Sequence, residues 1–221
     1  MALPIDTWIF DLDNTLYPAR CNLFAQVDRK IGEYMAGYLG VSYDQAKILQ
    51  KQYWRQHGTS LRGMMVEHGC PPQAFLDYVH DIDVGAVPSS PALDAALARL
   101  PGRKLIFTNG TIAHAERVMA RLGVRHHFEH VFDIVASDYI PKPDAGVYRR
   151  FVDRHGIDPA RAVMLEDTAH NLIPAHEMGM RTVWVRTEES IARHALSGGA
   201  TDHIHHQTDD VVAWLEQWLR R

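Results

Sequence analysis

The sequence predicts an α/β protein with a doubly wound, mainly parallel sheet and an inserted helical segment. From about residue 100 onward, short apolar runs alternate with stretches of helical pattern, which is typical of parallel strands joined by right-handed crossovers. Several of these helical stretches end at a glycine, as helices with left-handed caps do. Residues 18–87 break the alternation, because they are helical in pattern and poor in strand signals.

The first strand is expected at residues 7–10, which have the apolar, β-branched and aromatic character of a buried strand. Four later runs are also short and apolar, and helical stretches separate them. Further strands are expected at 104–107, 131–135, 162–165 and 181–185, and helices at 111–122, 144–155, 168–178 and 209–221. The last helix is amphipathic, since Val211, Val212, Leu215 and Leu219 recur at helical spacing.

The segment between the first two strands is expected to contain three helices. Apolar residues recur at three- and four-residue steps from Phe24 to Tyr38, a second helical pattern covers 42–57, and a third ends near Val79. Seventy residues are too many for one crossover, which favours an inserted cap over helices that simply pack on a face of the sheet.

Domain boundaries follow from this insertion. A chain of 221 residues exceeds a typical single domain without requiring two independent ones. The expected division is a core of residues 1–17 and 88–221 and a helical cap domain of residues 18–87 inserted after the first strand.

Bulk composition matches a globular protein, with 46% hydrophobic and 23% charged residues. A net charge of −4 gives no reason to expect a nucleic-acid polymer or a membrane surface as partner. No apolar run approaches the roughly 20 residues that span a bilayer, and residues 1–6 are not expected to be a signal peptide. Two cysteines without metal-site spacing favour a reducing compartment. We expect a cytoplasmic monomer or homodimer.

The first strand runs directly into two acidic residues, Asp11 and Asp13. Side chains alternate along a strand, so these carboxylates can point the same way about 7 Å apart. A buried pair of like charges is costly unless a cation or a shared proton compensates it. The alternative interpretation is an ordinary turn or helix cap.

Polar residues follow the next two strands as well. Thr108, Asn109 and Gly110 lead into a helix N-terminus, which offers N–H donors to an anion, although Asn-Gly is also an ordinary turn. Lys142 stands between two prolines, whose fixed φ angles suit a rigidly held ammonium group beside carboxylate and phosphoryl charge. A solvent-exposed lysine in a proline-rich loop is the alternative.

A second acidic pair, Glu166 and Asp167, ends the strand expected at 162–165. Ligands of doubly wound sheets bind beyond the carboxyl ends of the strands, so the acidic residues are expected at one site. Three carboxylates at one edge would require a cation, and hard oxygen ligands are those that Mg²⁺ prefers. Asp167 could alternatively be a helix N-cap.

Together these motifs resemble those of the haloacid dehalogenase superfamily. Four motifs follow strands in the family's order: Asp11-x-Asp13, Thr108, Lys142 and Glu166-Asp167. The resemblance covers the core, and the helical insert lies where one class of the family keeps its cap. It implies a doubly wound core of Rossmann-like type and an enzyme rather than a pure binding module, since the motif residues are all present.

The resemblance implies catalytic roles for three residues. Asp11 is the implied nucleophile, which forms an aspartyl-phosphate, and Asp13 is the implied acid and then base. Lys142 would orient Asp11 and stabilise charge. Dehalogenases of the superfamily lack the second Asp, so Asp13 favours phosphoryl transfer. A phosphomutase of the same superfamily remains an alternative to a phosphatase.

Ligand-binding roles are implied in the same way. Phosphoryl oxygens would be held by Thr108 and by the backbone around Asn109 and Gly110. The implied cofactor is Mg²⁺, and its ligands would be Asp11, the main-chain carbonyl of Asp13, Asp167 and, directly or through a water, Glu166.

The insert carries the clues to the substrate. Residues 13–18 (DNTLYP), 53–63 (YWRQHGTSLRG) and 78–81 (YVHD) resemble the pyrimidine 5′-nucleotidase branch of the superfamily. An aromatic residue can stack on a base, and His57 or Arg62 could bind a base edge or a phosphate. We therefore expect a phosphorylated metabolite, most simply a pyrimidine nucleoside monophosphate, with a phosphoglycolate or sugar-phosphate phosphatase as the rival. Two histidine clusters lack zinc-enzyme spacing and receive no role.

Overall fold

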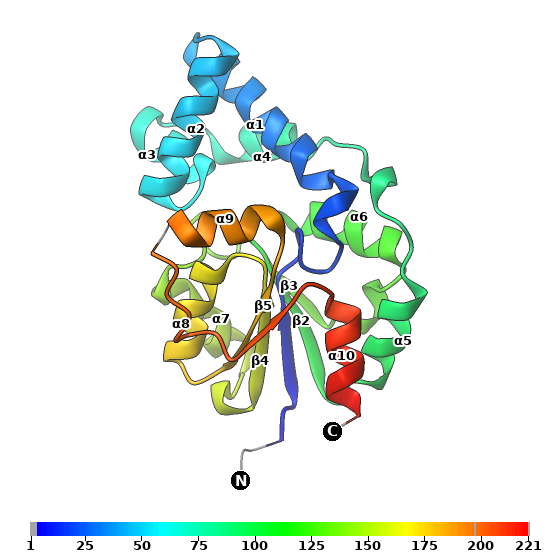
Figure 1. The fold of residues 1–221 in the computed structure, drawn as a ribbon. Coiled ribbons are helices and arrows are strands. Elements are labelled where there is room, and N and C mark those ends of the chain that lie inside the picture. The colour runs from blue at the N-terminus through cyan, green and yellow to red at the C-terminus, as the bar shows by residue number, and fades with distance from the viewer. Residues whose placement is uncertain (1–3, 197, 221) are drawn as a thin grey trace.

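A six-stranded, entirely parallel sheet forms the centre of the computed structural model, which describes residues 4–196 and 198–220 (Figure 1). The strands are β1 (Thr7–Phe10), β2 (Arg103–Phe107), β3 (His130–Phe132), β4 (Ala162–Glu166), β5 (Arg181–Val185) and β6 (His206–Thr208). Their order, β3-β2-β1-β4-β5-β6, puts the change in winding direction between β1 and β4. The predicted doubly wound parallel sheet is therefore confirmed.

Helices occur both around the sheet and in the segment after β1. The segment contains α1 (Leu23–Leu39), α2 (Tyr43–His57), α3 (Ser60–His68) and α4 (Pro72–Val79). The others are α5 (Pro91–Arg99), α6 (Ile112–Leu122), α7 (Ala145–His155), α8 (Ile173–Glu177), α9 (Glu188–Leu196) and α10 (Val211–Leu219). Figure 1 shows α1–α4 grouped at the end of the sheet toward which β1 runs, away from both labelled termini.

Two hydrophobic cores cover the two faces of the sheet, as the alternation of side chains along each strand requires. Trp8 and Phe10 of β1 belong to one core, which continues into the helices of the insert. Ile9, between them, belongs to the other core with Phe151 of α7. In Figure 1, α5 and α10 lie on one side of the sheet and α7 and α8 on the other.

One expected strand ends early and one expected helix is interrupted, and each change has a local cause. The strand expected at 131–135 ends at Phe132, because the Asp133 carboxylate accepts hydrogen bonds from Ile112 N (3.0 Å) and Ala136 N (2.9 Å) and turns the chain. The helix expected at 168–178 is a 3-10 turn followed by α8, since Pro174 has no N–H to continue the ladder.

Among the described α-helices and strands, α3, α5, α9 and β6 were not predicted. A turn at Gly58 (φ 82°) separates α3 from α2, and the Thr59 side chain caps α3 by accepting from Arg62 N at 3.1 Å. Ser90 caps α5 and Pro91 begins it, a start signal that the expected pattern did not include. Strand β6 is a three-residue edge strand of polar residues, so it carries no apolar signal. Residues 1–3 and Arg221, which fell within the expected core and last helix, lie outside the described residues.

The insert contacts the core from two directions. Arg117 of α6 donates to the main-chain oxygen of His80 at the end of α4, across 2.9 Å. Gly58 lies against the Pro141 ring, which a Cβ atom at Gly58 would meet at 3.0 Å.

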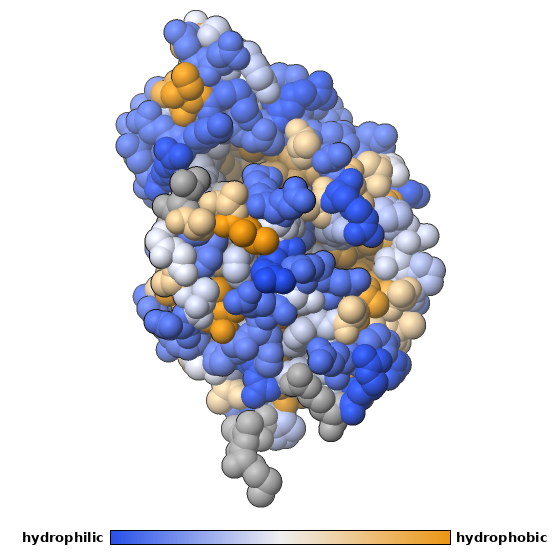
Figure 2. Space-filling view, viewed as in Figure 1, coloured by the Kyte–Doolittle hydropathy of each residue, from blue (hydrophilic) through white to orange (hydrophobic). Residues whose placement is uncertain are grey.

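Hydrophilic residues cover most of the face shown in Figure 2, with hydrophobic residues in small separate groups. Among the described helices, none combines the length and the apolar character of a membrane span.

Candidate active site

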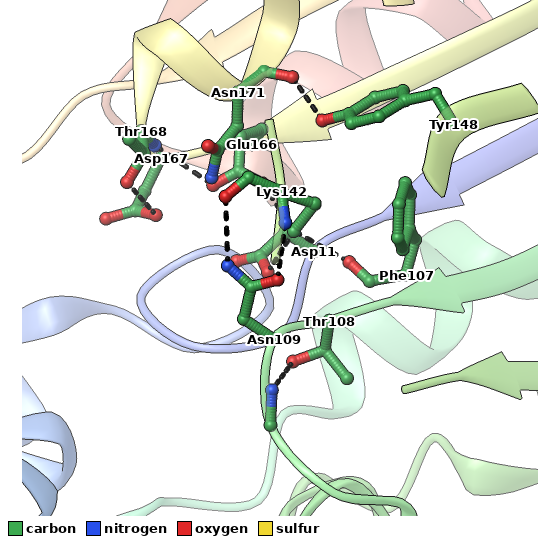
Figure 3. Close-up of polar contacts among 11 residues, drawn as sticks. Asp11, Phe107, Thr108, Asn109, Lys142, Tyr148, Glu166, Asp167, Thr168 and Asn171 are labelled. Carbon is green, nitrogen blue, oxygen red and sulfur yellow. Dashed lines mark hydrogen bonds and ion pairs between the residues drawn. The ribbon is translucent and has the colours of Figure 1, made fainter. Parts of the chain in front are cut away.

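Three carboxylates meet at the carboxyl edge of the sheet because β1 and β4 are neighbouring parallel strands. Asp11 extends the pairing, since its N–H donates to Leu165 O at 2.9 Å. Glu166 ends β4 and Asp167 follows it, so both come to the same edge (Figure 3). One oxygen from each of Asp11, Glu166 and Asp167 lies within 4.8 Å of the others, and all three residues are buried.

Lys142 supplies the cation that faces this cluster. Its Nζ donates to Asp11 Oδ1 (2.8 Å), Glu166 Oε2 (2.6 Å) and Phe107 O (2.8 Å). Burial alone would lower the pKa of Lys142, but the two carboxylates hold that pKa above its ordinary value. The ammonium group is therefore a permanent charge in the site, not the solvent-exposed lysine that the proline-rich loop also allowed.

One ammonium group does not neutralise three carboxylates. Burial, and then the charge of Glu166, raise the pKa of Asp11 from 3.8 to about 7 against the opposing effect of Lys142. A raised carboxyl pKa means that ionised Asp11 is destabilised where it stands. The site therefore favours a further cation.

The donor set suits Mg²⁺. Carboxylate oxygens are hard ligands, and the three converging groups carry the charge that a small divalent cation offsets. Glu166 is also tied to the protein, since Oε2 accepts from Lys142 and Oε1 accepts from Thr168 N at 3.1 Å. Asp167 is oriented by a 3.3 Å hydrogen bond from the Thr168 hydroxyl. Asp11, Asp167 and Glu166 are thus the side chains that would hold the ion.

The Thr108-Asn109-Gly110 turn lies beside Lys142. The Asn109 side chain accepts from Lys142 N (2.9 Å) and donates to Lys142 O (3.5 Å) (Figure 3). These two bonds hold the backbone of residues 140–144, the segment around Lys142 that we call the lysine loop. The Thr108 hydroxyl accepts from Gly110 N at 2.9 Å and keeps its own proton for donation. The Gly110 N–H is therefore engaged within the turn, while the Thr108 hydroxyl can donate to an anion.

Asp13 does not join the three-carboxylate cluster through its side chain. Its Oδ1 accepts from Tyr17 Oη (2.6 Å) and lies 2.8 Å from His114 Nε2. Burial would raise the pKa of Asp13, but His114 and the two hydrogen bonds hold that pKa below its ordinary value. Burial and the Asp13 charge also raise the pKa of Tyr17, so the phenol remains a donor.

Sequence reasoning missed Tyr17 and His114 as parts of the site. A signal for His114 was present, because it lies in the first turn of α6 on the face that buries Ala115 and Val118. A histidine on an apolar helix face just beyond a Thr-Asn-Gly turn needs a polar partner. Tyr17 lies within the motif at 13–18, which does not by itself mark the phenol as a partner of Asp13.

His57 and Arg62, the residues expected to contact substrate, line a cavity of about 430 Å³ between the insert and the lysine loop. Its wall on the core side includes Pro141 and Asp144. His57 Nε2 lies 3.1 Å from Glu67, so His57 already faces an acidic neighbour.

Tyr53, an aromatic residue of the same motif four residues before His57, is buried, and its hydroxyl pairs with His68 at 2.6 Å. Tyr53 also leaves no room for a side chain at Gly63. It is therefore part of the packing of the insert and not a free stacking surface.

His126 and His127, two members of the histidine cluster formed by His126, His127 and His130, contact Asp94 outside this site. Asp94 Oδ1 lies 2.7 Å from His127 Nε2 and 3.2 Å from His126 Nε2. The three groups converge closely enough to hold a metal ion. The carboxylate already partners both rings, and two of the three side chains are substantially exposed, so the pairing with Asp94 accounts for the arrangement.

A doubly wound sheet with a buried, lysine-bound acidic centre at its carboxyl edge defines an α/β protein with a helical segment inserted after β1. The chain belongs to the haloacid dehalogenase-like hydrolases, whose family model matches residues 5–179. The family that the motifs indicated is therefore confirmed.

Two curated relatives resemble the chain along most of its length. Phosphate metabolism protein 8 of Saccharomyces cerevisiae is 25% identical over 190 residues, which are 78% of this chain and 59% of the yeast protein. The chain thus matches less than two thirds of that relative. The fructose-1-phosphate phosphatase YqaB of Escherichia coli is 27% identical over 186 residues, which are 80% of this chain and 95% of the relative.

Solved structures share the fold. CbbY from Rhodobacter sphaeroides, in complex with phosphate, has a TM-score of 0.66 and 18% identity over 93% of this chain and 94% of its own. The haloacid dehalogenase-type (HAD) phosphatase from Thermococcus onnurineus has a TM-score of 0.64 and 16% identity over 97% and 98%. At these identities the likeness concerns the fold alone.

Proposed function

We propose that this protein is a Mg²⁺-dependent phosphomonoester hydrolase that forms an aspartyl-phosphate on Asp11. The observation that carries the proposal is the buried group of Asp11, Glu166 and Asp167 around the Lys142 ammonium. Such a centre attracts a divalent cation, and the charge of that cation would offset the repulsion between the carboxylates and an anionic phosphate. The E. coli relative named as a phosphatase supports the same class of reaction.

The reaction divides between two aspartates. In the first step an Asp11 oxygen attacks phosphorus, the bond from phosphorus to the leaving oxygen breaks, and Asp13, in its protonated form, gives its proton to that oxygen. In the second step water attacks phosphorus and gives a proton to Asp13, and the bond to Asp11 breaks to release inorganic phosphate. Lys142 orients Asp11, and the Thr108 hydroxyl donates to a phosphoryl oxygen. Bound Mg²⁺ supplies positive charge against the phosphoryl oxygens.

Residues 18–87 act in this proposal as a cap domain over the core of residues 1–17 and 88–221. The cavity between His57, Arg62 and the lysine loop supports this role, since residues of both parts line it. The cap then selects the leaving group, while the core performs the chemistry.

The substrate that we propose is a pyrimidine nucleoside 5′-monophosphate. The motifs at 13–18, 53–63 and 78–81 support it, and Arg62 offers a cationic donor fork for a polar base edge or a phosphate.

A sugar phosphate is the second candidate, for two reasons. The E. coli relative is named for fructose 1-phosphate. The described residues that line the cavity also include no Tyr, Trp or Phe to stack on a base.

Phosphate release from a substrate panel tests both candidates. The panel contains UMP, CMP, dTMP, AMP, GMP, phosphoglycolate, fructose 1-phosphate and other hexose phosphates, each with Mg²⁺, with EDTA and with Asp11→Asn. Selective hydrolysis of UMP and CMP that EDTA and the variant abolish is the expected result. Hydrolysis of sugar phosphates would keep the chemistry and replace the substrate. Absence of release from every substrate would contradict the proposal and favour a phosphomutase.

A further inference from the structure

Asp13 has two hydrogen-bond partners, and both meet the same carboxylate oxygen. Tyr17 Oη lies 2.6 Å from Oδ1, and His114 Nε2 lies 2.8 Å from the same atom. Tyr17 comes from the loop that follows β1. His114 comes from α6 and is 101 residues from Asp13 along the chain. Within the described residues, Oδ2 has no comparable partner.

The direction of these hydrogen bonds is determined by the partners. An ionised carboxylate only accepts, so the phenol and His114 Nε2 are the donors. His114 is fully buried, and its Nδ1 has no hydrogen-bond partner among the described residues. Because the carboxylate can only accept, the proton of this hydrogen bond is on His114 Nε2. His114 therefore stands as a donor aimed at Asp13.

The His114 ring is held in its plane by the insert. His80, just after α4, stacks on it with ring centroids 4.7 Å apart and an interplanar angle of 13°. His80 Nδ1 lies 3.3 Å from Thr111 Oγ1, the cap of α6, which also accepts from His114 N at 3.2 Å. The donor to Asp13 is thus fixed by groups from both the core and the insert.

We infer that Tyr17 and His114 are positioning residues that hold Asp13 by Oδ1 and leave Oδ2 to exchange the proton with the leaving oxygen and with water. The inference rests on the proposed function, in which Asp13 is the acid and then the base. With Oδ1 engaged by two donors, a proton on that atom would displace one of them, so the transferable proton resides on Oδ2. Neither residue touches the phosphoryl group in this inference, and each acts through Asp13.

A positioning role predicts a signature that a general packing role does not. Protonation of the leaving oxygen matters greatly for a poor leaving group such as phenolate and little for p-nitrophenolate. Loss of the support for Asp13 therefore lowers the rate selectively for the poorer leaving group. The quantity to measure is kcat/KM, which reports the steps up to the first release of product.

The experiment compares p-nitrophenyl phosphate with phenyl phosphate in the wild-type protein and in Tyr17→Phe and His114→Leu. We expect the ratio of the two kcat/KM values to shift against phenyl phosphate by about tenfold or more, since general acid catalysis contributes about 10²–10⁴-fold. His114→Gln, which keeps an N–H donor, is expected to restore much of the ratio. The full-length protein with Mg²⁺ is used throughout.

Two matched controls separate position from packing. Tyr34→Phe removes a phenol that contacts Cys70 Sγ at 3.6 Å, and His127→Leu removes a histidine 2.7 Å from Asp94. Both pairs lie outside the site, so the controls should leave the ratio unchanged. An equal loss on both substrates in Tyr17→Phe and His114→Leu would overturn the inference, as would wild-type ratios.

A structural measurement decides the inference even if the proposed function fails. If the wild-type protein releases phosphate from neither substrate, the proposed function is wrong while the hold on Asp13 can still be tested. Crystal structures of His114→Gln and of the double variant Tyr17→Phe/His114→Leu, which removes both donors, should then show Asp13 unchanged in His114→Gln and turned to another rotamer in the double variant. An unmoved Asp13 in the double variant would overturn the positioning role.

Discussion

The Lys142 ammonium donates to Glu166 Oε2 across 2.6 Å and thereby joins the loop after β3 to the end of β4. Both side chains are almost fully buried, and the same ammonium also reaches Asp11 at 2.8 Å. One cation thus orients the proposed nucleophile and one proposed metal ligand together. Any change at Lys142 acts on both groups.

Replacing Lys142 is expected to destabilise the protein as well as to remove activity. Lys142→Met leaves the buried Asp11 and Glu166 carboxylates without their partner, and breaking such a pair costs about 3–5 kcal/mol of unfolding free energy. Urea denaturation without metal measures the loss. Lys30→Met is the matched control, because Lys30 pairs with exposed Asp81 and such pairs contribute about 1 kcal/mol or less. Equal losses in the two variants would contradict the prediction.

Asp11→Asn is expected to become relatively more stable as pH rises. The folded protein keeps the Asp11 proton up to a pKa of about 7, while the unfolded chain releases it near 3.8. Between these values the folded state binds more protons, so the wild-type unfolding free energy falls with rising pH, by at most about 1.4 kcal/mol per unit. Asn at this position cannot ionise, so the unfolding free energy of the variant lacks this decrease with rising pH.

Metal-free denaturation of wild type and Asp11→Asn at pH 5, 6, 7 and 8 checks this sign. The stability difference should grow in favour of the variant toward pH 8. Added Mg²⁺ serves as the control, because it should stabilise the wild-type protein more than the variant, whose amide is the weaker ligand. A difference that stays constant from pH 5 to 8 would refute the prediction.

Removal of Mg²⁺ is expected to lower the melting temperature. A ligand that binds only the folded state stabilises it by about 2.7 kcal/mol at one hundred times its Kd. Asp167→Asn should reduce this stabilisation, because Asp167 is one of the three converging carboxylates. Thermal melts with EDTA and with increasing Mg²⁺ measure the effect.

Asp94→Asn provides the control for the Mg²⁺ titration. Asp94 belongs to the other convergent group, with His126 and His127, so its loss should leave the Mg²⁺-dependent shift intact. A shift that disappears in Asp94→Asn but persists in Asp167→Asn would move the metal site to the surface cluster.

Most of the sheet could be predicted because the buried strands have continuous apolar sequences. The residues that follow β1, β2 and β4 were also predictable, since parallel strands bring their carboxyl ends to one edge. Strand β6 was not predictable, because it is polar and lies at the sheet edge. The short β3 depended on Asp133, whose carboxylate accepts a local hydrogen bond from Ala136 N and a second one from Ile112 N, 21 residues away in sequence.

The candidate site was predictable where motif order carried the information and not where side chains meet from different elements. The pairing of Lys142 with Asp11 spans 131 residues and was anticipated from the motifs. The hydrogen bond between His114 and Asp13 was not anticipated, because the sequence around a single histidine in a helix does not indicate which residue it contacts. The motif at 53–63 does not show that Tyr53 is buried within the insert, where its hydroxyl pairs with His68.

Arg62→Ala is expected to weaken substrate recognition without disabling the chemistry. Arg62 lines the cavity between the insert and the lysine loop, away from the three carboxylates. A hydrogen bond to a charged group is worth about 1.5–3 kcal/mol, so KM for the preferred metabolite should rise about tenfold or more. Phenyl phosphate, which has no polar groups beyond its phosphate, should keep its kcat/KM within about twofold if Arg62 contacts only the leaving group.

Arg55→Ala, at an exposed position of α2, is the control and should change neither value. If Arg62→Ala lowers kcat/KM equally for phenyl phosphate and for the preferred metabolite, Arg62 binds the phosphate instead of the leaving group, and the cap no longer explains substrate choice through this residue.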